Sequence, residues 1–124
     1  MRRLLEFEKR VESDEDILAV MLFGSSLRDA SPSDIDLCMI MRQGDFSRLF
    51  LSEKRLDYLR DFPDYDVRIF QQLPIYIRIR VLKEGKTIYC RDEDSLYDLA
   101  IREIREFERF RPIYEDYLEG VLHA

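Results

Sequence analysis

The chain alternates between continuous apolar runs and segments in which apolar residues recur every three or four positions. Continuous apolar runs cover residues 17–23 and, after the acidic start of the segment 35–41, residues 37–41. They predict strands that are buried on both faces. Residues 65–70 (YDVRIF) and 86–90 (KTIYC) read as shorter strands. We therefore expect an α/β fold with a small mixed β-sheet.

Helical spacing predicts the elements around this sheet. Residues 2–12 gather their apolar side chains near one face of a helix. A second helix is expected after Gly44, with Asp45 as a cap and with a face that covers the sheet. Its expected apolar positions are Phe46, Leu49, Phe50, Leu56 and Leu59. With these helices packed mainly on one face, the sheet would have a core on that side.

The C-terminal part of the chain carries the longest apolar stripe. From Ser95 to about Val121 the apolar residues keep helical spacing, interrupted by Pro112. Proline removes one backbone hydrogen bond, so we expect a kink or two helices within 94–122. We expect this stripe to pack against the sheet, and the alternative is an interface with a partner.

The segment Leu73–Lys83 is ambiguous by pattern alone. Its apolar residues alternate as in a strand, whereas Pro74 at its start and Gly85 after its end are typical of helix boundaries. Local periodicity favours a strand here.

Composition narrows the classes of function. The 124 residues fit one domain over 1–124, with a formal net charge of −6. We therefore expect no free nucleic acid as a partner. No apolar run of about 18 residues and no leader peptide is visible, so we expect a cytoplasmic protein with no membrane contact. Cys38 and Cys90 lack metal-ligand spacing and are expected to be buried free thiols.

The turn between the first two strands carries the candidate chemistry. Asp34 and Asp36 are two positions apart at the start of a strand, so they point to one face and offer oxygen ligands to a hard cation. Gly24 permits a tight turn, and the backbone N–H groups of Ser25 and Ser26 would attract a phosphate. An aspartate pair alone is most often a solvated strand start. The order strand, Gly-Ser, strand with Asp-x-Asp favours a metal–nucleotide site instead.

At these residues the chain resembles the polymerase-beta-like nucleotidyltransferase superfamily, and in particular its minimal nucleotidyltransferase (MNT) members. The resemblance covers most of 17–90. It rests on Phe23-Gly24-Ser25, on Ser33-Asp34-Ile35-Asp36-Leu37, and more loosely on Tyr65-Asp66-Val67, Leu73-Pro74, Lys83-Glu84-Gly85-Lys86 and Ile88-Tyr89. It implies that residues after Pro74 form a helix, against the local alternation.

The resemblance also implies a reaction and a set of site residues. Three acids would hold two Mg²⁺ ions while AMP passes from ATP to a hydroxyl, and by motif position these acids are Asp34, Asp36 and Asp66. Asp64 competes with Asp66 for the third position, and Asp66 is favoured because apolar strand residues follow it. Asp66 would also take the proton of the hydroxyl. The nucleotide-binding residues would be Gly24, Ser25, Ser26 and Arg28.

Two departures from the family pattern keep alternatives open. The segment between Ser25 and Asp34 is about two residues shorter than in many relatives, and Ser26 and Asp29 stand where many have Arg and Gly. Arg28 matches a commonly basic position, although a surface ion pair would explain it equally well. Arg68, Lys83 and Lys86 are expected to be solvated rather than bound to phosphate.

The family resemblance implies a HEPN-type helical toxin as protein partner, with this chain as its antitoxin and a tyrosine as acceptor. A homo-oligomer is also compatible with the sequence. The alternative is a non-catalytic module that neutralises a helical partner by contact. Transfer to a small molecule such as an aminoglycoside is less favoured, because 124 residues leave little room for a second substrate domain.

Overall fold

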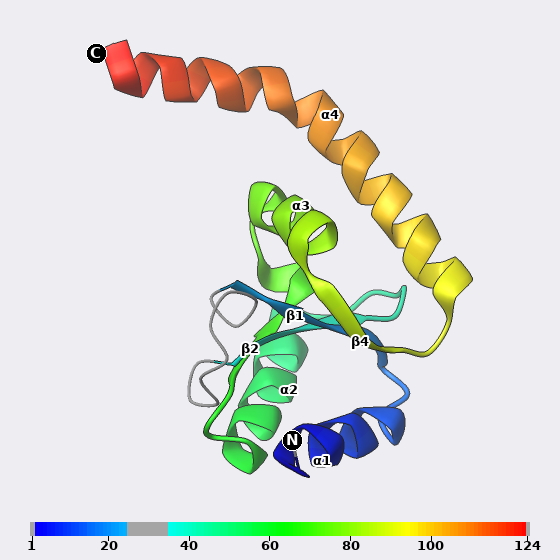
Figure 1. The fold of residues 1–124 in the computed structure, drawn as a ribbon. Coiled ribbons are helices and arrows are strands. Elements are labelled where there is room, and N and C mark those ends of the chain that lie inside the picture. The colour runs from blue at the N-terminus through cyan, green and yellow to red at the C-terminus, as the bar shows by residue number, and fades with distance from the viewer. Residues whose placement is uncertain (1, 25–34, 124) are drawn as a thin grey trace.

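The computed structural model describes residues 2–24 and 35–123 and has helices on both sides of one sheet (Figure 1). The sheet consists of β1 (Ile17–Phe23), β2 (Asp36–Met41), β3 (Asp66–Ile69) and β4 (Lys86–Cys90). The helices are α1 (Arg2–Glu12), α2 (Arg48–Asp61), α3 (Ile75–Glu84) and α4 (Glu93–His123), with a 3₁₀ turn, η3, at Phe70–Gln72. The mixed α/β fold expected from the sequence is confirmed.

The strand order β3-β2-β1-β4 combines two kinds of pairing. β1 pairs antiparallel with both β2 and β4, whereas β2 and β3 are parallel. A parallel pair needs a crossover connection, and α2 supplies it between β2 and β3. The crossover brings the beginning of β3 beside the beginning of β2, where the candidate aspartates lie.

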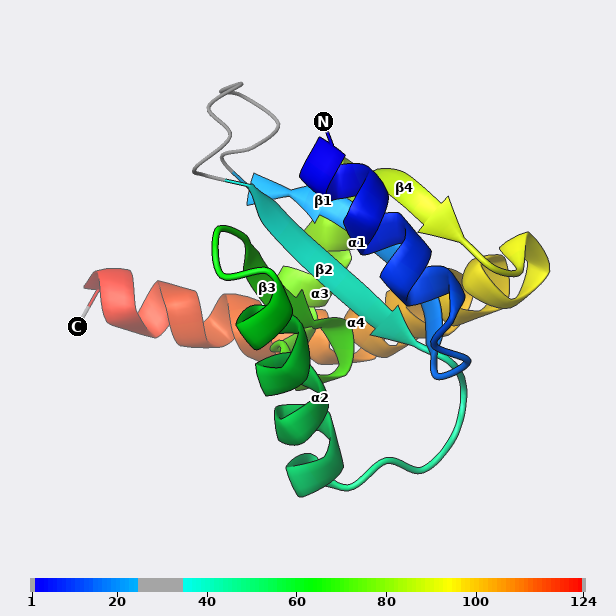
Figure 2. The ribbon, with the colours of Figure 1, turned by 90° about the horizontal axis from the view of Figure 1, so that it is seen from below.

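Each face of the sheet has its own hydrophobic core. On one face Leu37 and Met39 pack with Phe7 of α1 and Tyr58 of α2. On the other face Cys38 and Ile40 pack with residues of α3 and α4, including Val81 and Leu99. Figure 2 shows α1 and α2 together on one side. The helices therefore cover both faces rather than mainly one, as was expected, and this explains the apolar runs of β1 and β2.

α2 differs in detail from its predicted form. The helix begins at Arg48, with Ser47 as its cap in place of Asp45, because the Ser47 hydroxyl accepts a hydrogen bond of 3.0 Å from the Phe50 N–H. Its buried residues are Leu51 and Tyr58. The predicted apolar positions were right in part: Phe46 and Leu59 pack against the core, whereas Leu49 and Leu56 are 69% and 57% exposed. Apolar residues lie all around this helix, so spacing alone could not identify its inner face.

α3 is a helix, as the family resemblance implied, although its isoleucines alternate. The Ile77 and Arg78 N–H groups donate to the Pro74 carbonyl, which starts the helix, and the Gly85 N–H donates to Val81 at its end. Proline and glycine at the boundaries thus outweighed the alternation between them.

α4 is one helix that continues through Pro112, and Figure 1 shows it changing direction partway along. Leu99 is its buried residue within the described part of the chain, and Leu96 and Phe107 are partly covered. Beyond Phe107 the described side chains are exposed, among them Ile113, Tyr117 and Val121 at 58–67%. Packing of the whole stripe on the sheet was therefore a wrong expectation, since the last turns extend past the body.

A single guanidinium fastens the end of α1 to the sheet. Arg91, directly after β4, donates through Nη2 to the carbonyls of Val11, Glu12 and Asp14 at 2.9–3.3 Å, and through Nε to Ile17 at 3.2 Å. The carbonyls at the end of α1 have no partners within the helix. Arg91 therefore acts as a C-terminal cap supplied from a distant strand.

A polar cluster is centred on Asp14, in the connection between α1 and β1. The Asp14 carboxylate accepts hydrogen bonds from Lys54 Nζ at 2.9 and 3.1 Å and from the Tyr58 hydroxyl at 2.9 Å. Burial by itself raises the pKa of Asp14, but these hydrogen bonds and the Lys54 charge outweigh it and hold that pKa below 3.8.

Both cysteines are free, Cys38 buried and Cys90 half-buried. Burial raises the pKa of the Cys38 thiol to about 12, which leaves it unreactive. Within the described residues, no helix combines the length and the apolar composition that crossing a membrane requires.

Candidate active site

Asp36 and Asp66 are direct partners on the parallel β2–β3 ladder. The Asp66 N–H donates to the carbonyl of Ile35 at 2.9 Å, which fixes the start of β3 beside the start of β2. Asp36 has the same parity as Cys38 and therefore points to the α3 and α4 face. Because paired residues on neighbouring strands share a face, the two carboxylates lie side by side at one edge of the sheet.

Gly24 closes the site from the end of β1. Its neighbour Phe23 is the antiparallel partner of Asp36, and Gly24 itself has a φ of +69°. A Cβ at this position would lie 2.7 Å from Asp36 Oδ2, closer than real Cβ contacts allow. Glycine is therefore required both by the backbone conformation and by the nearness of the carboxylate.

Two guanidinium groups adjoin Asp66. Arg68 Nε lies 3.4 Å from Asp66 Oδ2, and Arg55 Nη2 lies 3.9 Å from Oδ1. Arg55 also donates through Nε to the Val67 carbonyl at 2.8 Å, so α2 orients this side chain along β3. Arg68, expected to be solvated, is exposed and also contacts the carboxylate. Sequence reasoning missed Arg55, because only the packing of α2 brings it to this edge.

A cavity of about 150 Å³ adjoins Gly24 on the α3 side. Its apolar wall is formed by Phe23, Ile77 and Val81, and its polar rim by Arg80 and Glu84, which form an ion pair at 3.5 Å. Apolar walls with a few polar groups are typical of small-molecule sites.

The structure brings three predicted site residues together in space: Gly24 lies beside Asp36, and Asp36 lies beside Asp66. Asp64, the competing third acid, lies in the exposed turn before β3 and outside the ladder. Lys83 and Lys86 are exposed. The other predicted site residues, which are Ser25, Ser26, Arg28 and Asp34, lie outside the described residues.

The donor set at this edge is suited to a hard cation. Two neighbouring carboxylates supply the oxygen ligands that Mg²⁺ prefers, and the Gly24 backbone lies close against the Asp36 carboxylate. Within 2–24 and 35–123, no three His, Cys, Asp or Glu side chains are grouped closely enough to hold a metal ion. A three-acid site would need the predicted contribution of Asp34.

Sequence comparison identifies relatives of the chain. The family described as "Polymerase beta, Nucleotidyltransferase" matches residues 6–94. A candidate protein adenylyltransferase of Methanocaldococcus jannaschii is 28% identical over 106 residues, which cover 81% of this chain and 71% of the relative.

Solved structures share the fold at low sequence identity. A chain of a toxin–antitoxin complex with AMP-PNP superposes with a TM-score of 0.70 at 14% identity, covering 98% of this chain and 97% of that chain. A chain from the complex of tri-AMPylated Shewanella oneidensis HEPN toxin with its MNT antitoxin gives 0.68 at 14% identity, covering 98% and 94%. With the family match spanning most of the chain and the acid pair in place, the chain belongs to the polymerase beta nucleotidyltransferase family.

Proposed function

We propose that this nucleotidyltransferase transfers AMP from ATP to a hydroxyl on a partner protein with the help of Mg²⁺. The observation that carries the proposal is the pairing of Asp36 with Asp66 beside the Gly24 turn. Among the acids described, Asp66 rather than Asp64 occupies the position next to Asp36, which supports it as the third acid. Asp34, Ser25, Ser26 and Arg28 complete the proposed site by motif position.

The reaction forms one phosphorus–oxygen bond and breaks another. The acceptor hydroxyl attacks the α-phosphorus of ATP, and the bond between the α-phosphorus and the bridging oxygen of pyrophosphate breaks. Bound Mg²⁺ would stabilise the charge on the attacking and leaving oxygens. Asp34, Asp36 and Asp66 would hold the cations, and Asp66 would also accept the proton of the hydroxyl. Arg55 and Arg68, already near Asp66, could offset negative charge on the phosphates.

The proposed acceptor is a tyrosine of a HEPN-type helical toxin, which makes this chain its antitoxin. Support comes from the solved complex of an AMPylated HEPN toxin with an MNT antitoxin, whose fold this chain shares. The exposed apolar turns of α4 add a surface that a helical partner could cover. ATP as donor is supported by the AMP-PNP complex of similar fold.

The test combines nucleotide binding with product analysis. Titration with a non-hydrolysable ATP analogue should show binding that needs Mg²⁺ and is lost in Asp36→Asn and Asp66→Asn. Incubation with ATP, Mg²⁺ and a HEPN-type protein of the same organism should add an AMP mass to a tyrosine of that protein. Asp64→Asn is the matched control and should retain both. Equal loss in Asp64→Asn and Asp66→Asn would contradict the proposed third acid.

A contact-only antitoxin is the second candidate, favoured by the uncovered face of α4. It predicts that the Asp36→Asn/Asp66→Asn double variant still neutralises the toxin in a growth assay. Neutralisation that requires both aspartates would exclude this candidate. Retention of neutralisation without any transferred AMP would exclude the catalytic proposal.

A further inference from the structure

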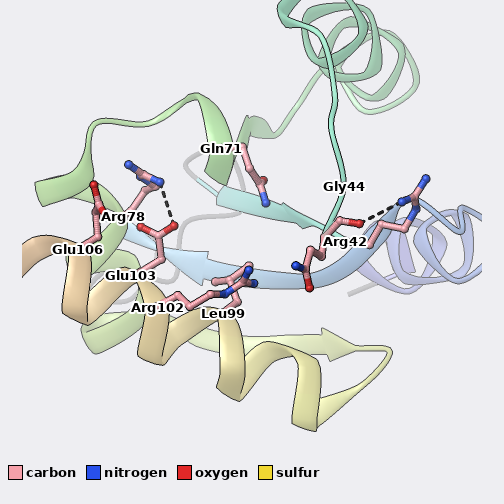
Figure 3. Close-up of a pocket in the computed structure, with 9 residues that line it drawn as sticks. Arg42, Gly44, Gln71, Arg78, Leu99, Arg102, Glu103 and Glu106 are labelled. Carbon is pink, nitrogen blue, oxygen red and sulfur yellow. Dashed lines mark hydrogen bonds and ion pairs between the residues drawn. The ribbon is translucent and has the colours of Figure 1, made fainter.

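The ion pairs between arginines and carboxylates differ in how open they are. Figure 3 shows one in which Arg78 Nη1 of α3 lies 2.9 Å from Glu103 Oε1 of α4, beside a cavity of about 320 Å³. Both side chains are largely buried, at 24% and 17% exposure, so this pair is a fixed link between two helices. The pair of Arg68 with Asp66 is longer, at 3.4 Å, and its side chains are 50% and 41% exposed. An exposed pair of this kind is weak, so the pair at the proposed transfer site is one that can open.

Both oxygens of the Asp66 carboxylate face a guanidinium. Arg68 Nε lies 3.4 Å from Oδ2, and Arg55 Nη2 lies 3.9 Å from Oδ1. Asp66 is also the proposed third metal ligand, so a cation that binds it must share the carboxylate with these groups. Like charges at one carboxylate repel each other. The two arginines therefore compete with a cation for Asp66.

The two arginines differ in how firmly they are held. Arg55 Nε donates to the Val67 carbonyl at 2.8 Å, which fixes this guanidinium along β3. Arg68 is hydrogen-bonded to Asp66 alone among the described residues. Both arginines line a cavity of about 200 Å³ beside β3, so there is space for the Arg68 side chain to rotate away from the carboxylate. Arg68 is thus the movable member of the group.

The neighbouring acid explains why a positive charge is needed at Asp66. Asp36 and Asp66 are direct partners on the β2–β3 ladder, and like charges opposite each other on neighbouring strands are destabilising. A guanidinium at Asp66 reduces this repulsion, and a bound cation would do the same. Arg68 and a cation therefore have the same electrostatic role at this carboxylate, and one can replace the other.

We propose that Arg68 is a charged placeholder at Asp66 that keeps Mg²⁺ binding weak until a nucleotide is present. The inference rests on the proposed function, because it takes Asp66 as a metal ligand and ATP as the donor. The triphosphate offers phosphate oxygens to Arg68 as alternative partners, and it offers Mg²⁺ further oxygen ligands. Both effects favour the exchange of Arg68 for Mg²⁺ at Asp66. Nucleotide and cation therefore bind cooperatively, and each raises the affinity for the other by the same factor.

The first experiment measures cation binding without nucleotide. The full chain is titrated with Mn²⁺, which suits the same oxygen ligands as Mg²⁺ and can be followed by electron paramagnetic resonance. Arg68→Gln should bind Mn²⁺ at least about threefold more tightly than the unmodified chain, because one positive charge beside the site is gone. Arg68→Lys keeps the charge and should bind Mn²⁺ as the unmodified chain does. Arg60→Gln, at an exposed position of α2, is the control for net charge and should change nothing.

The second experiment measures the coupling between cation and nucleotide. The affinity for a non-hydrolysable ATP analogue is measured in Mg²⁺ and in EDTA, and the ratio of the two affinities is the coupling factor. This factor should be at least about threefold smaller in Arg68→Gln than in the unmodified chain, since the cation no longer needs the nucleotide to displace a guanidinium from Asp66. Arg68→Lys should restore the coupling. A merely structural role for Arg68 would lower the urea midpoint without changing this factor.

The outcomes separate this inference from the proposed function. Mn²⁺ binding that is weakened by Asp66→Asn but unchanged or weakened by Arg68→Gln would overturn the placeholder role while supporting the proposed metal site. An unchanged coupling factor in Arg68→Gln would overturn it as well. If the Asp36→Asn/Asp66→Asn variant binds Mn²⁺ and the ATP analogue as tightly as the unmodified chain does, the acid pair is not the site, and the proposed function fails together with the inference.

Discussion

A Cβ on Gly24 would lie 2.7 Å from Asp36 Oδ2, so the Gly24 backbone and the first side chain of β2 are packed directly against each other. Gly24→Ala should therefore displace Asp36 as well as strain a residue with φ of +69°. We expect a loss of about 1–3 kcal/mol in the free energy of unfolding and at least a tenfold loss of ATP binding. Urea unfolding and calorimetry measure the two effects. Gly120→Ala, which adds a Cβ in open space, is the control.

Arg91 should be one of the more costly exposed residues to replace. Its guanidinium donates to four carbonyls around the end of α1, and alanine leaves them without these donors. We expect Arg91→Ala to lower the free energy of unfolding by about 2 kcal/mol, measured as a lower urea midpoint at unchanged slope. Arg60→Ala, which removes an exposed pair with Asp57, should cost less than about 1 kcal/mol. Equal costs for the two variants would refute the capping role of Arg91.

The Asp14 cluster makes stability depend on acid pH. The pKa of Asp14 is 3.8 in the unfolded chain and lower in the folded chain. At a pH between these two pKa values the unfolded chain therefore binds more protons than the folded chain. The contribution of Asp14 is therefore complete above pH 3.8 and is lost as the pH falls through its folded pKa.

Tyr58→Phe checks this dependence because it removes the hydroxyl that donates to Asp14. We expect a cost of about 1–2 kcal/mol at neutral pH and a smaller cost well below pH 3.8, where Asp14 is protonated. Urea unfolding at the two pH values measures the difference. A cost that stays constant with pH would show that Tyr58 contributes by packing alone.

The last turns of α4 should contribute little to the stability of the chain itself. A variant that ends at Glu108 loses Ile113, Tyr117 and Val121, which are mostly exposed. We expect the free energy of unfolding to change by less than about 1 kcal/mol, whereas Leu99→Ala, at a buried position of the same helix, should cost about 2–4 kcal/mol. If the proposed toxin covers this surface, the shortened chain should lose toxin binding. A large loss of stability would mean that the last turns pack on the body after all.

Local pattern predicted the strands well and the inner faces of the helices poorly. The apolar runs of β1 and β2 have one explanation, burial on both faces, and the structure confirms it. In α2, Leu49 and Leu56 have the same apolar character as Leu51, and only the position of the sheet decides which is buried. The stripe of α4 likewise shows which face is apolar but not whether anything lies beneath it.

The residues of the candidate site also differ in how well the sequence predicts them. Gly24 and Asp36 belong to a compact motif that can be read from neighbouring residues. The sequence favours Asp66 over Asp64 only through the apolar residues after Asp66, and the β2–β3 register adds that Asp66 lies beside Asp36. Arg55 carries no local signal, because it meets β3 only after α2 has packed.

The parallel pairing of β2 with β3 also sets the order in which the site can assemble during folding. Asp36 and Asp66 meet only after α2 has docked, since this helix carries the chain back to the start of the sheet. Such non-local contacts form late, because the loop between them must close first. β3 is a four-residue edge strand held by one ladder. Opening of this edge would separate the two acids while the rest of the sheet stays folded, so amide exchange at Val67 and Ile69 would report directly on the integrity of the site.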